Sequence, residues 1–97
     1  MKKSYRFTSK VWQYPGMSGW YFVGLPKKES KEIKEGHNRV AGFGSVPVSV
    51  TIGKTKWKTS IFPDKRSETY LLPLKAEVRK KEGIFSDDTI SVHIEIK

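Results

Sequence analysis

The chain has 97 residues, of which 36% are hydrophobic and 30% charged, and its formal net charge at pH 7 is +9. This length predicts one domain, residues 1–97, with a single modest core. The chain has no cysteine, which excludes disulfides, thiol catalysis and Cys-ligated zinc. Its basic balance favours anionic partners but carries no information about the fold.

Apolar runs in the sequence are short. None of them approaches the roughly 20 residues that span a bilayer. The basic N-terminus, MKKSYRFTSK, lacks the apolar region of a signal peptide. We therefore expect a cytoplasmic protein that has no membrane partner.

The N-terminal third predicts a β-hairpin and a short helix. Residues 5–14 and 20–25 are rich in aromatic and aliphatic side chains, and PGMSG connects them. The apolar parity changes between Val11 and Trp12, which predicts a bulge or a barrel corner. Residues 26–36 (PKKESKEIKEG) contain a single apolar residue and predict a surface helix that ends at its glycine.

The middle of the chain alternates between apolar and polar residues. Residues 46–52 (VPVSVTI) place their valines and isoleucine on one face, which is typical of a half-buried strand. The Gly-Lys pair that follows predicts a tight hairpin turn, because glycine supplies the positive φ that such turns need. The returning strand, residues 55–62, should direct Trp57 and Ile61 inward and its lysines toward solvent.

The C-terminal third predicts a short strand, a helix and a longer strand. Residues 69–73 (TYLLP) form the short strand. Residues 73–83 (PLKAEVRKKEG) predict a helix with Pro73 in its first turn and Gly83 at its end. The last strand, residues 89–97 (TISVHIEIK), alternates strictly and directs its isoleucines and valine inward.

The number and spacing of these elements predict the fold class. About six short, mostly antiparallel strands and two short helices in fewer than 100 residues indicate a mainly β protein. This spacing favours a small barrel over a two-layer sandwich. The sequence contains no long-period repeat and no low-complexity tail.

Four blocks of the sequence together resemble a small bacterial family of unknown function. The blocks are YPGMSGWYFVGLP, VPVSVTIGKTKWKTSIFPDK, YLLPLKAEVRK and GIFSDDTISVHIEI, and they extend over roughly residues 5–96. Domains of that family occur alone or fused ahead of YdeI/OmpD-associated, bacteriocin-protection-type domains. The resemblance implies a double-split β-barrel, an architecture that is also associated with AbrB/MazE-like DNA-binding proteins, although a fold does not fix a function.

One turn departs from the family's pattern. Where the family often has a Gly-Asp turn before the last strand, this chain has Ser86, Asp87 and Asp88. Adjacent aspartates are best interpreted as turn-forming residues, because their side chains bond the local backbone. The geometry of this turn is left open by the sequence.

The sequence offers no set of residues suited to catalysis or metal binding. His37 and His93 are isolated, and two solvated imidazoles explain them better than a catalytic base, which needs a positioned partner. The glycines of AGFGS lack the following helix that a phosphate-binding loop requires. We therefore expect no catalytic residue, no metal and no cofactor.

Two groups of residues are candidates for contact with an anionic partner. The candidates for a small anion or phosphate are Trp57, Lys58, Ser60, Lys75 and Arg79. The candidates for nucleic-acid contact are Lys54, Lys56 and Tyr14. Lys75 and Arg79 are four residues apart and carry like charge, which is mildly unfavourable in a helix unless an anion bridges them. The alternative is that both are solvated, with their aliphatic stems lying over the barrel.

Aromatic residues flank the connection at residues 15–19. They are Trp12, Tyr14, Trp20 and Tyr21. Beside positive charge, such residues form stacking platforms for bases. A small barrel also uses large side chains to close its ends, so both interpretations stay open.

These features favour a non-enzymatic binding module for an anionic partner, either nucleic acid or a phosphorylated ligand. One alternative is a protein-interaction module, which would act on the larger domains to which relatives are fused or would self-associate. Another is a small-molecule-binding or enzymatic barrel with a pocket at one end. The sequence leaves the oligomeric state, monomer or dimer, open.

Overall fold

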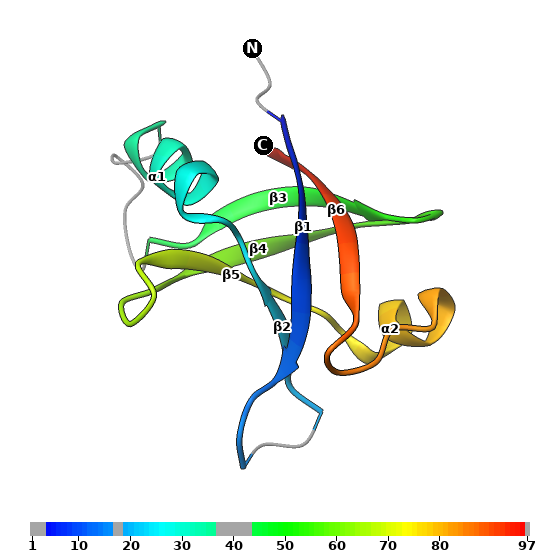
Figure 1. The fold of residues 1–97 in the computed structure, drawn as a ribbon. Helices are drawn as coiled ribbons and strands as arrows, with labels where there is room; N and C mark the ends of the chain where they lie inside the picture. Colours follow the sequence, from blue (N-terminus) through cyan, green and yellow to red (C-terminus); the bar gives the residue numbers. More distant parts are fainter. Residues whose placement is uncertain (1–3, 17–18, 37–43, 97) are drawn as a thin grey trace.

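The computed structural model describes residues 4–16, 19–36 and 44–96, and these form a closed β-barrel (Figure 1). The strands are β1 (Ser4–Gln13), β2 (Tyr21–Gly24), β3 (Val46–Ile52), β4 (Thr55–Asp64), β5 (Thr69–Pro73) and β6 (Thr89–Ile96). The helices are α1 (Lys27–Gly36) and α2 (Ala76–Glu82). Around the barrel the strand order is β1-β2-β5-β4-β3-β6, with antiparallel pairing throughout. The predicted mainly β barrel with two short helices is confirmed.

Alternation along the strands builds the core. The four aliphatic residues of β3 are all buried, as are Val92, Ile94 and Ile96 of β6. In β4, Ile61 is buried and Trp57 packs half-buried against the core. The predicted inward faces of these three strands are confirmed. Successive side chains of a strand point to opposite faces, so the alternation of apolar and polar residues shows which face is buried.

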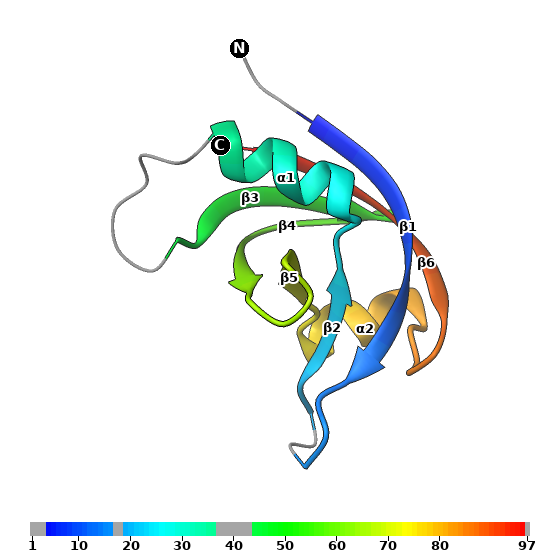
Figure 2. The ribbon, with the colours of Figure 1, turned by 60° about the vertical axis from the view of Figure 1, so that its left-hand side comes forward.

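The two helices lie at opposite ends of the barrel, as the two ribbon views show (Figures 1 and 2). Helix α1 follows β2 and buries Ser30 and Ile33. Helix α2 follows β5 and buries Val78, and Leu74 before it and Ile84 after it are also buried. Helices this short are marginal in isolation, so these contacts with the barrel hold them in place.

Left-handed backbone occurs in several turns, two of which bear on the sequence predictions. Gly53, between β3 and β4, has φ 58°, and the carboxylate of Glu82 occupies the space where a Cβ would lie. Asp87, before β6, has φ 73°, and the carboxylate of Asp88 accepts a hydrogen bond from the backbone N–H of Phe85 at 2.8 Å. The interpretation of the aspartate pair as turn-forming is confirmed.

Two element boundaries differ from the prediction. Helix α2 begins at Ala76, and Pro73 is the last residue of β5, where it pairs with Phe22. The end of a strand tolerates the missing N–H of proline as well as a first helical turn does. Strand β4 continues to Asp64 because its pairing with β5 extends to that residue. The predicted end of α2 at a glycine is confirmed, since Gly83 caps the helix in the left-handed conformation.

Strand β1 keeps a single alternation along its length. Phe7 and Val11 are buried, and the residues of opposite parity, from Arg6 to Trp12, lie on the outside. The predicted change of face is therefore wrong, although β1 does pass from its pairing with β6 (residues 4–10) to its pairing with β2 (residues 11–13) at this point of the barrel. Aromatic side chains suggested a core position for Trp12, but in this strand the outward face also carries large rings.

Candidate functional site

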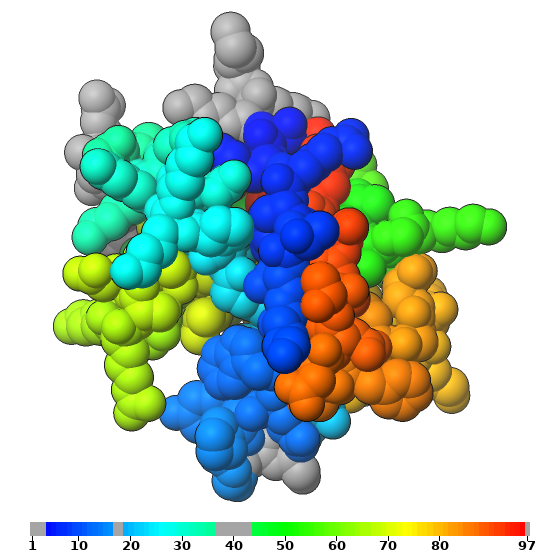
Figure 3. Space-filling view, viewed as in Figure 1, coloured from blue at the N-terminus to red at the C-terminus, as the bar shows by residue number. Residues whose placement is uncertain are grey.

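Four aromatic side chains gather on the outward side of the β1–β2 hairpin. We call this group the aromatic face, and its members are Trp12, Tyr14, Trp20 and Phe22. Trp12 and Phe22 are direct cross-strand partners. The backbone N–H of Tyr14 donates to the carbonyl of Trp20 at 2.8 Å, which extends the hairpin pairing past the ends of the strands. Figure 3 shows the end of this hairpin, in blue at the bottom, projecting from the molecule.

Phe22 is the centre of the aromatic face. Its ring centroid lies 5.2 Å from that of Trp12, 6.2 Å from that of Trp20 and 6.3 Å from that of Tyr14. Trp20 is 53% exposed and Tyr14 43% exposed. Those two residues alone leave roughly 200 Å² of aromatic surface in water, given the size of such side chains. Of the four aromatic residues that flank residues 15–19, Trp12 and Tyr21 are half-buried, whereas Trp20 and Tyr14 are exposed.

The apolar surface continues from the aromatic face across the neighbouring strands. Pro73 of β5 pairs with Phe22, and Leu71 lies between Gly24 of β2 and Phe62 of β4. Phe62 is 45% exposed. Because these residues share the outward parity of their strands, they extend the aromatic face into an apolar band.

Arg79 of α2 contacts the β1–β2 hairpin on the side opposite to the aromatic face. Its guanidinium carbon lies 3.9 Å from the centre of the Tyr21 ring, which is cation–π geometry. Its Nε donates to the carbonyl of Leu74 at 3.1 Å, and its Nη2 donates to the carbonyl of Gly19 at 3.4 Å. Arg79 therefore attaches the hairpin to α2, and much of its donor capacity is used within the protein.

The residues predicted to bind a small anion are not directed to one point. Trp57 faces the barrel interior, whereas Lys58 and Ser60 share the outward parity of β4. Lys75 precedes α2 as its N-cap residue and forms an ion pair with Glu77 at 3.6 Å. The anion-binding role of these residues, with that of Arg79, stays a prediction.

The residues predicted to contact nucleic acid also divide between two places. Tyr14 belongs to the aromatic face. Lys54 is exposed in the β3–β4 turn, and Lys56 forms an ion pair with Glu95 at 3.5 Å on the outside of the barrel. Exposed ion pairs of this kind contribute little to stability, about 0–1 kcal/mol. Lys56 can therefore leave this ion pair at little cost in stability and contact another anion.

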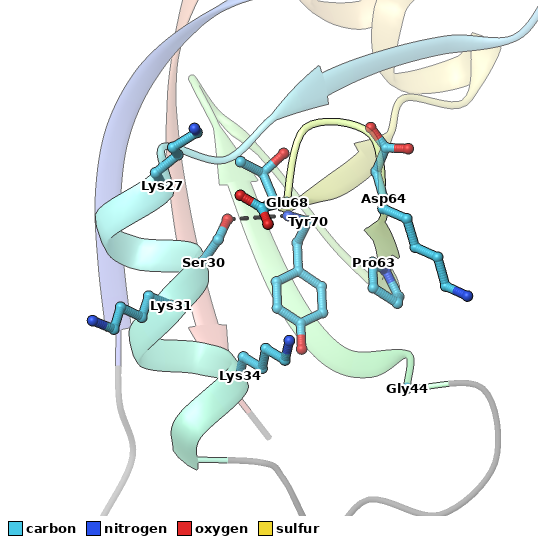
Figure 4. Close-up of a pocket in the computed structure, with 11 residues that line it drawn as sticks. Lys27, Ser30, Lys31, Lys34, Gly44, Pro63, Asp64, Glu68 and Tyr70 are labelled. Atoms are coloured by element: carbon cyan, nitrogen blue, oxygen red, sulfur yellow. Dashed lines mark hydrogen bonds between the residues drawn. The ribbon is translucent and has the colours of Figure 1, made fainter.

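A second feature was not foreseen from the sequence. A cavity of about 660 Å³ lies between α1 and the β4–β5 hairpin (Figure 4). We call it the lysine cavity, because its lining includes Lys27, Lys31, Lys34 and Lys65, together with Pro63 and Tyr70. The signal in the sequence is the spacing of the three α1 lysines, i, i+4 and i+7, which places them on one side of a helix.

Histidine and acidic residues do not form a reactive cluster in the described part of the chain. His93 is half-buried on the outward side of β6. Within residues 4–16, 19–36 and 44–96, no group of three ligating side chains could hold a metal ion. His37 and Gly42 lie outside the described residues.

None of the helices described above is long and apolar enough to span a membrane.

Comparison with known proteins places the chain in a family. A search of curated proteins found no match. The model of the family described as Domain of unknown function (DUF1905) matches residues 7–94. Because this match extends over most of the chain, the protein belongs to the DUF1905 family, which confirms the resemblance to a family of unknown function.

Proposed function

We propose that this protein is a non-enzymatic module that binds single-stranded nucleic acid through the aromatic face. The observation that supports this most strongly is the contact of four rings on the outside of a hairpin, two of them about half exposed. Exposed aromatic patches on small domains often mark interaction sites. A base of any identity can stack on such rings, because every base has a π face.

Charge is the second argument. The formal net charge of +9 attracts a polyanion over long range. Lys10 is exposed two residues before Trp12 on the same side of β1, where it can neutralise a phosphate next to a stacked base. In this proposal Lys54, Lys56 and Lys58 contribute by general attraction, whereas Tyr14 and Trp20 contact bases directly.

The shape of the aromatic face favours a single strand over a duplex. Bases within a duplex are stacked on one another, so their faces cannot reach rings on the side of a hairpin. Bases of a single strand can turn outward and stack on aromatic side chains. Either RNA or single-stranded DNA meets this requirement.

The test is fluorescence anisotropy with short labelled oligothymidylate and oligouridylate at low salt. Stacking contributes about 1–3 kcal/mol per base, so the double variant Tyr14→Ala/Trp20→Ala, which removes two stacking rings, should weaken binding by at least roughly 30-fold. Phe85→Ala is the control, since Phe85 is 71% exposed but lies outside the aromatic face. Equal affinities for the double variant and the wild type would refute the proposal, as would the absence of binding to both oligonucleotides.

Salt dependence gives an independent check. The logarithm of the binding constant should fall linearly with the logarithm of salt concentration, with a slope of about −0.7 for each phosphate contacted. Lys10→Gln should make this slope shallower by a little under one unit, and Lys80→Gln should leave it unchanged. A binding constant that does not respond to salt contradicts a nucleic-acid partner.

The apolar band favours a second candidate, a protein-interaction module. Exposed Phe62, with Leu71 and Pro73, extends the aromatic face onto β5 and β4, and contiguous apolar patches are typical of protein interfaces. The partner would be a second copy or a domain of the YdeI/OmpD-associated type. Light scattering at several concentrations and pull-down from a host extract test this candidate. Association that persists at high salt and is lost in Phe62→Ser would support it.

A further inference from the structure

The lysine cavity is separate from the aromatic face and needs its own explanation. Its volume of about 660 Å³ is within the range of small-molecule sites in proteins. It lies between α1 and the β4–β5 hairpin (Figure 4), and none of the aromatic-face residues lines it.

Three lysines of α1 line this cavity. Figure 4 shows the amino group of Lys34 directed toward Tyr70 and that of Lys31 directed away from the opposite wall. Lys27, Lys31 and Lys34 repeat at i, i+4 and i+7, a spacing at which like charges repel one another. Lys65, from the opposite wall, adds a fourth cation. Within the part of the chain that the structure describes, no carboxylate lies within 4.0 Å of any of these four amino groups. A bound anion would remove this repulsion.

The wall of the cavity is held by buried hydrogen bonds. The backbone N–H of Tyr70 donates to Oγ of Ser30 at 3.0 Å, and Ser30 is only 2% exposed. The backbone N–H of Leu25 donates to the carbonyl of Tyr70 at 2.9 Å. These bonds attach the start of α1 to β5, so the cavity does not depend on side-chain placement alone.

Tyr70 supplies a neutral donor. Its ring is almost completely buried, and Figure 4 shows its hydroxyl directed toward the same part of the cavity as the amino group of Lys34. Burial raises the pKa of Tyr70, so the hydroxyl remains protonated at neutral pH. A phenol beside an ammonium group is a suitable pair of donors for a phosphate oxygen.

The acidic residues of the cavity do not cancel this arrangement. Asp64 and Glu68 also line it. One oxygen of Asp64 already accepts hydrogen bonds from the backbone N–H and the hydroxyl of Ser67, at 3.3 and 2.8 Å. Four lysines against two carboxylates leave the lining with a net positive charge.

We infer that the lysine cavity binds a small phosphate monoester. Lys34 and the Tyr70 hydroxyl would hold the phosphate group, Lys27 would add positive charge from the start of α1, and Pro63 with the aliphatic stems of the lysines would contact the body of the molecule. A lining with net positive charge, a phenol donor and an apolar wall suits such a ligand. This inference is independent of the nucleic-acid proposal.

The experiment is an amide chemical-shift titration by NMR with three probes: adenosine monophosphate, inorganic phosphate and adenosine. We expect saturable shifts at Ser30, Lys34 and Tyr70 with a phosphate-bearing probe, and none with adenosine. Lys27→Gln/Lys34→Gln should weaken binding at least about tenfold, because one charge-assisted contact and a second positive charge of the lining are lost. Lys28→Gln/Lys80→Gln is the matched control, because it removes the same charge from exposed lysines outside the cavity.

Two further variants keep the test specific. Tyr70→Phe should weaken binding by a few-fold without unfolding the domain, because it removes only the hydroxyl. Tyr14→Ala/Trp20→Ala should leave phosphate binding unchanged even where nucleic-acid binding is lost. The inference is overturned if neither phosphate-bearing probe gives saturable shifts in the cavity. It is also overturned if the matched control weakens binding as much as Lys27→Gln/Lys34→Gln does.

Discussion

The aromatic face and the lysine cavity are assembled in different ways. The aromatic face comes from one hairpin, and its central contact joins cross-strand partners, Trp12 and Phe22, that are close in sequence. The lysine cavity joins a helix to a distant hairpin, and the hydrogen bond that holds its wall connects Ser30 and Tyr70, which are 40 positions apart. One region is apolar and convex, whereas the other is cationic and concave.

This difference shows why the two regions suit different ligands. A projecting hairpin with exposed rings can reach the bases of a flexible strand, and it needs no enclosure. A cavity beside a helix encloses a small molecule and contacts it from two walls. The two proposals therefore predict binding functions that are separable by mutation.

The largest decrease in stability is expected from substitutions that remove a buried side chain beside one helix at a time. Ile33→Ala in α1 and Leu74→Ala before α2 each remove a side chain that is at most 2% exposed. Each should reduce the free energy of unfolding by about 2–5 kcal/mol, measured by urea denaturation. Ile33→Ala should abolish phosphate shifts at the lysine cavity while Leu74→Ala preserves them. If both variants lose these shifts equally, the cavity does not depend on α1 in particular.

A smaller effect is expected where Arg79 attaches the hairpin to α2. Arg79→Ala removes a cation–π contact and two hydrogen bonds, so it should reduce the free energy of unfolding by about 1–2 kcal/mol. It should also weaken nucleic-acid binding and leave the cavity unaffected. Arg79→Lys keeps the charge but loses the planar fork of donors. Recovery of full nucleic-acid affinity in Arg79→Lys would indicate a role through charge instead of hairpin geometry.

The smallest expected effect is a dependence of folding stability on alkaline pH. Burial raises the pKa of Tyr70, and burial with Glu32 and Glu29 nearby raises that of Tyr5, above the ordinary value of 10.0. The folded protein therefore holds these protons when the unfolded chain has lost them, so the contribution of the two tyrosines to stability is constant below about pH 10 and falls above it. Tyr70→Phe should reduce this fall, as followed by thermal unfolding between neutral and alkaline pH. An identical alkaline loss in Tyr70→Phe would contradict the assignment.

Much of the barrel could be predicted from residues that are near one another in the chain. Alternation in β3 and β6 correctly predicted the buried faces, and the turn residues Gly53 and Asp87 were recognised from their types. The ambiguous cases were Trp12 and Pro73. Trp12 is compatible with either face of a strand, and Pro73 with either the end of a strand or the start of a helix.

The candidate sites were predictable only in part. Tyr14 was selected from the sequence and lies in the aromatic face, but Phe22 at its centre was not selected, because its partners are set by hairpin register. Trp57 and Lys58 were grouped although adjacent strand residues point to opposite faces. Lys34 and Tyr70 were missed, because nothing local relates a helix lysine to a tyrosine on a distant strand.

The sequence by itself determined the presence and order of the strands and helices, the buried sides of β3, β4 and β6, and the net charge. These properties depend on side-chain periodicity and backbone preference, which operate over a few residues. Only the tertiary structure decided that Arg79 donates a hydrogen bond to the carbonyl of Gly19, 60 positions away, and that α1 forms a cavity with the β4–β5 hairpin. Such contacts follow from strand order and barrel closure, which bring together residues whose separation along the chain carries no local signal.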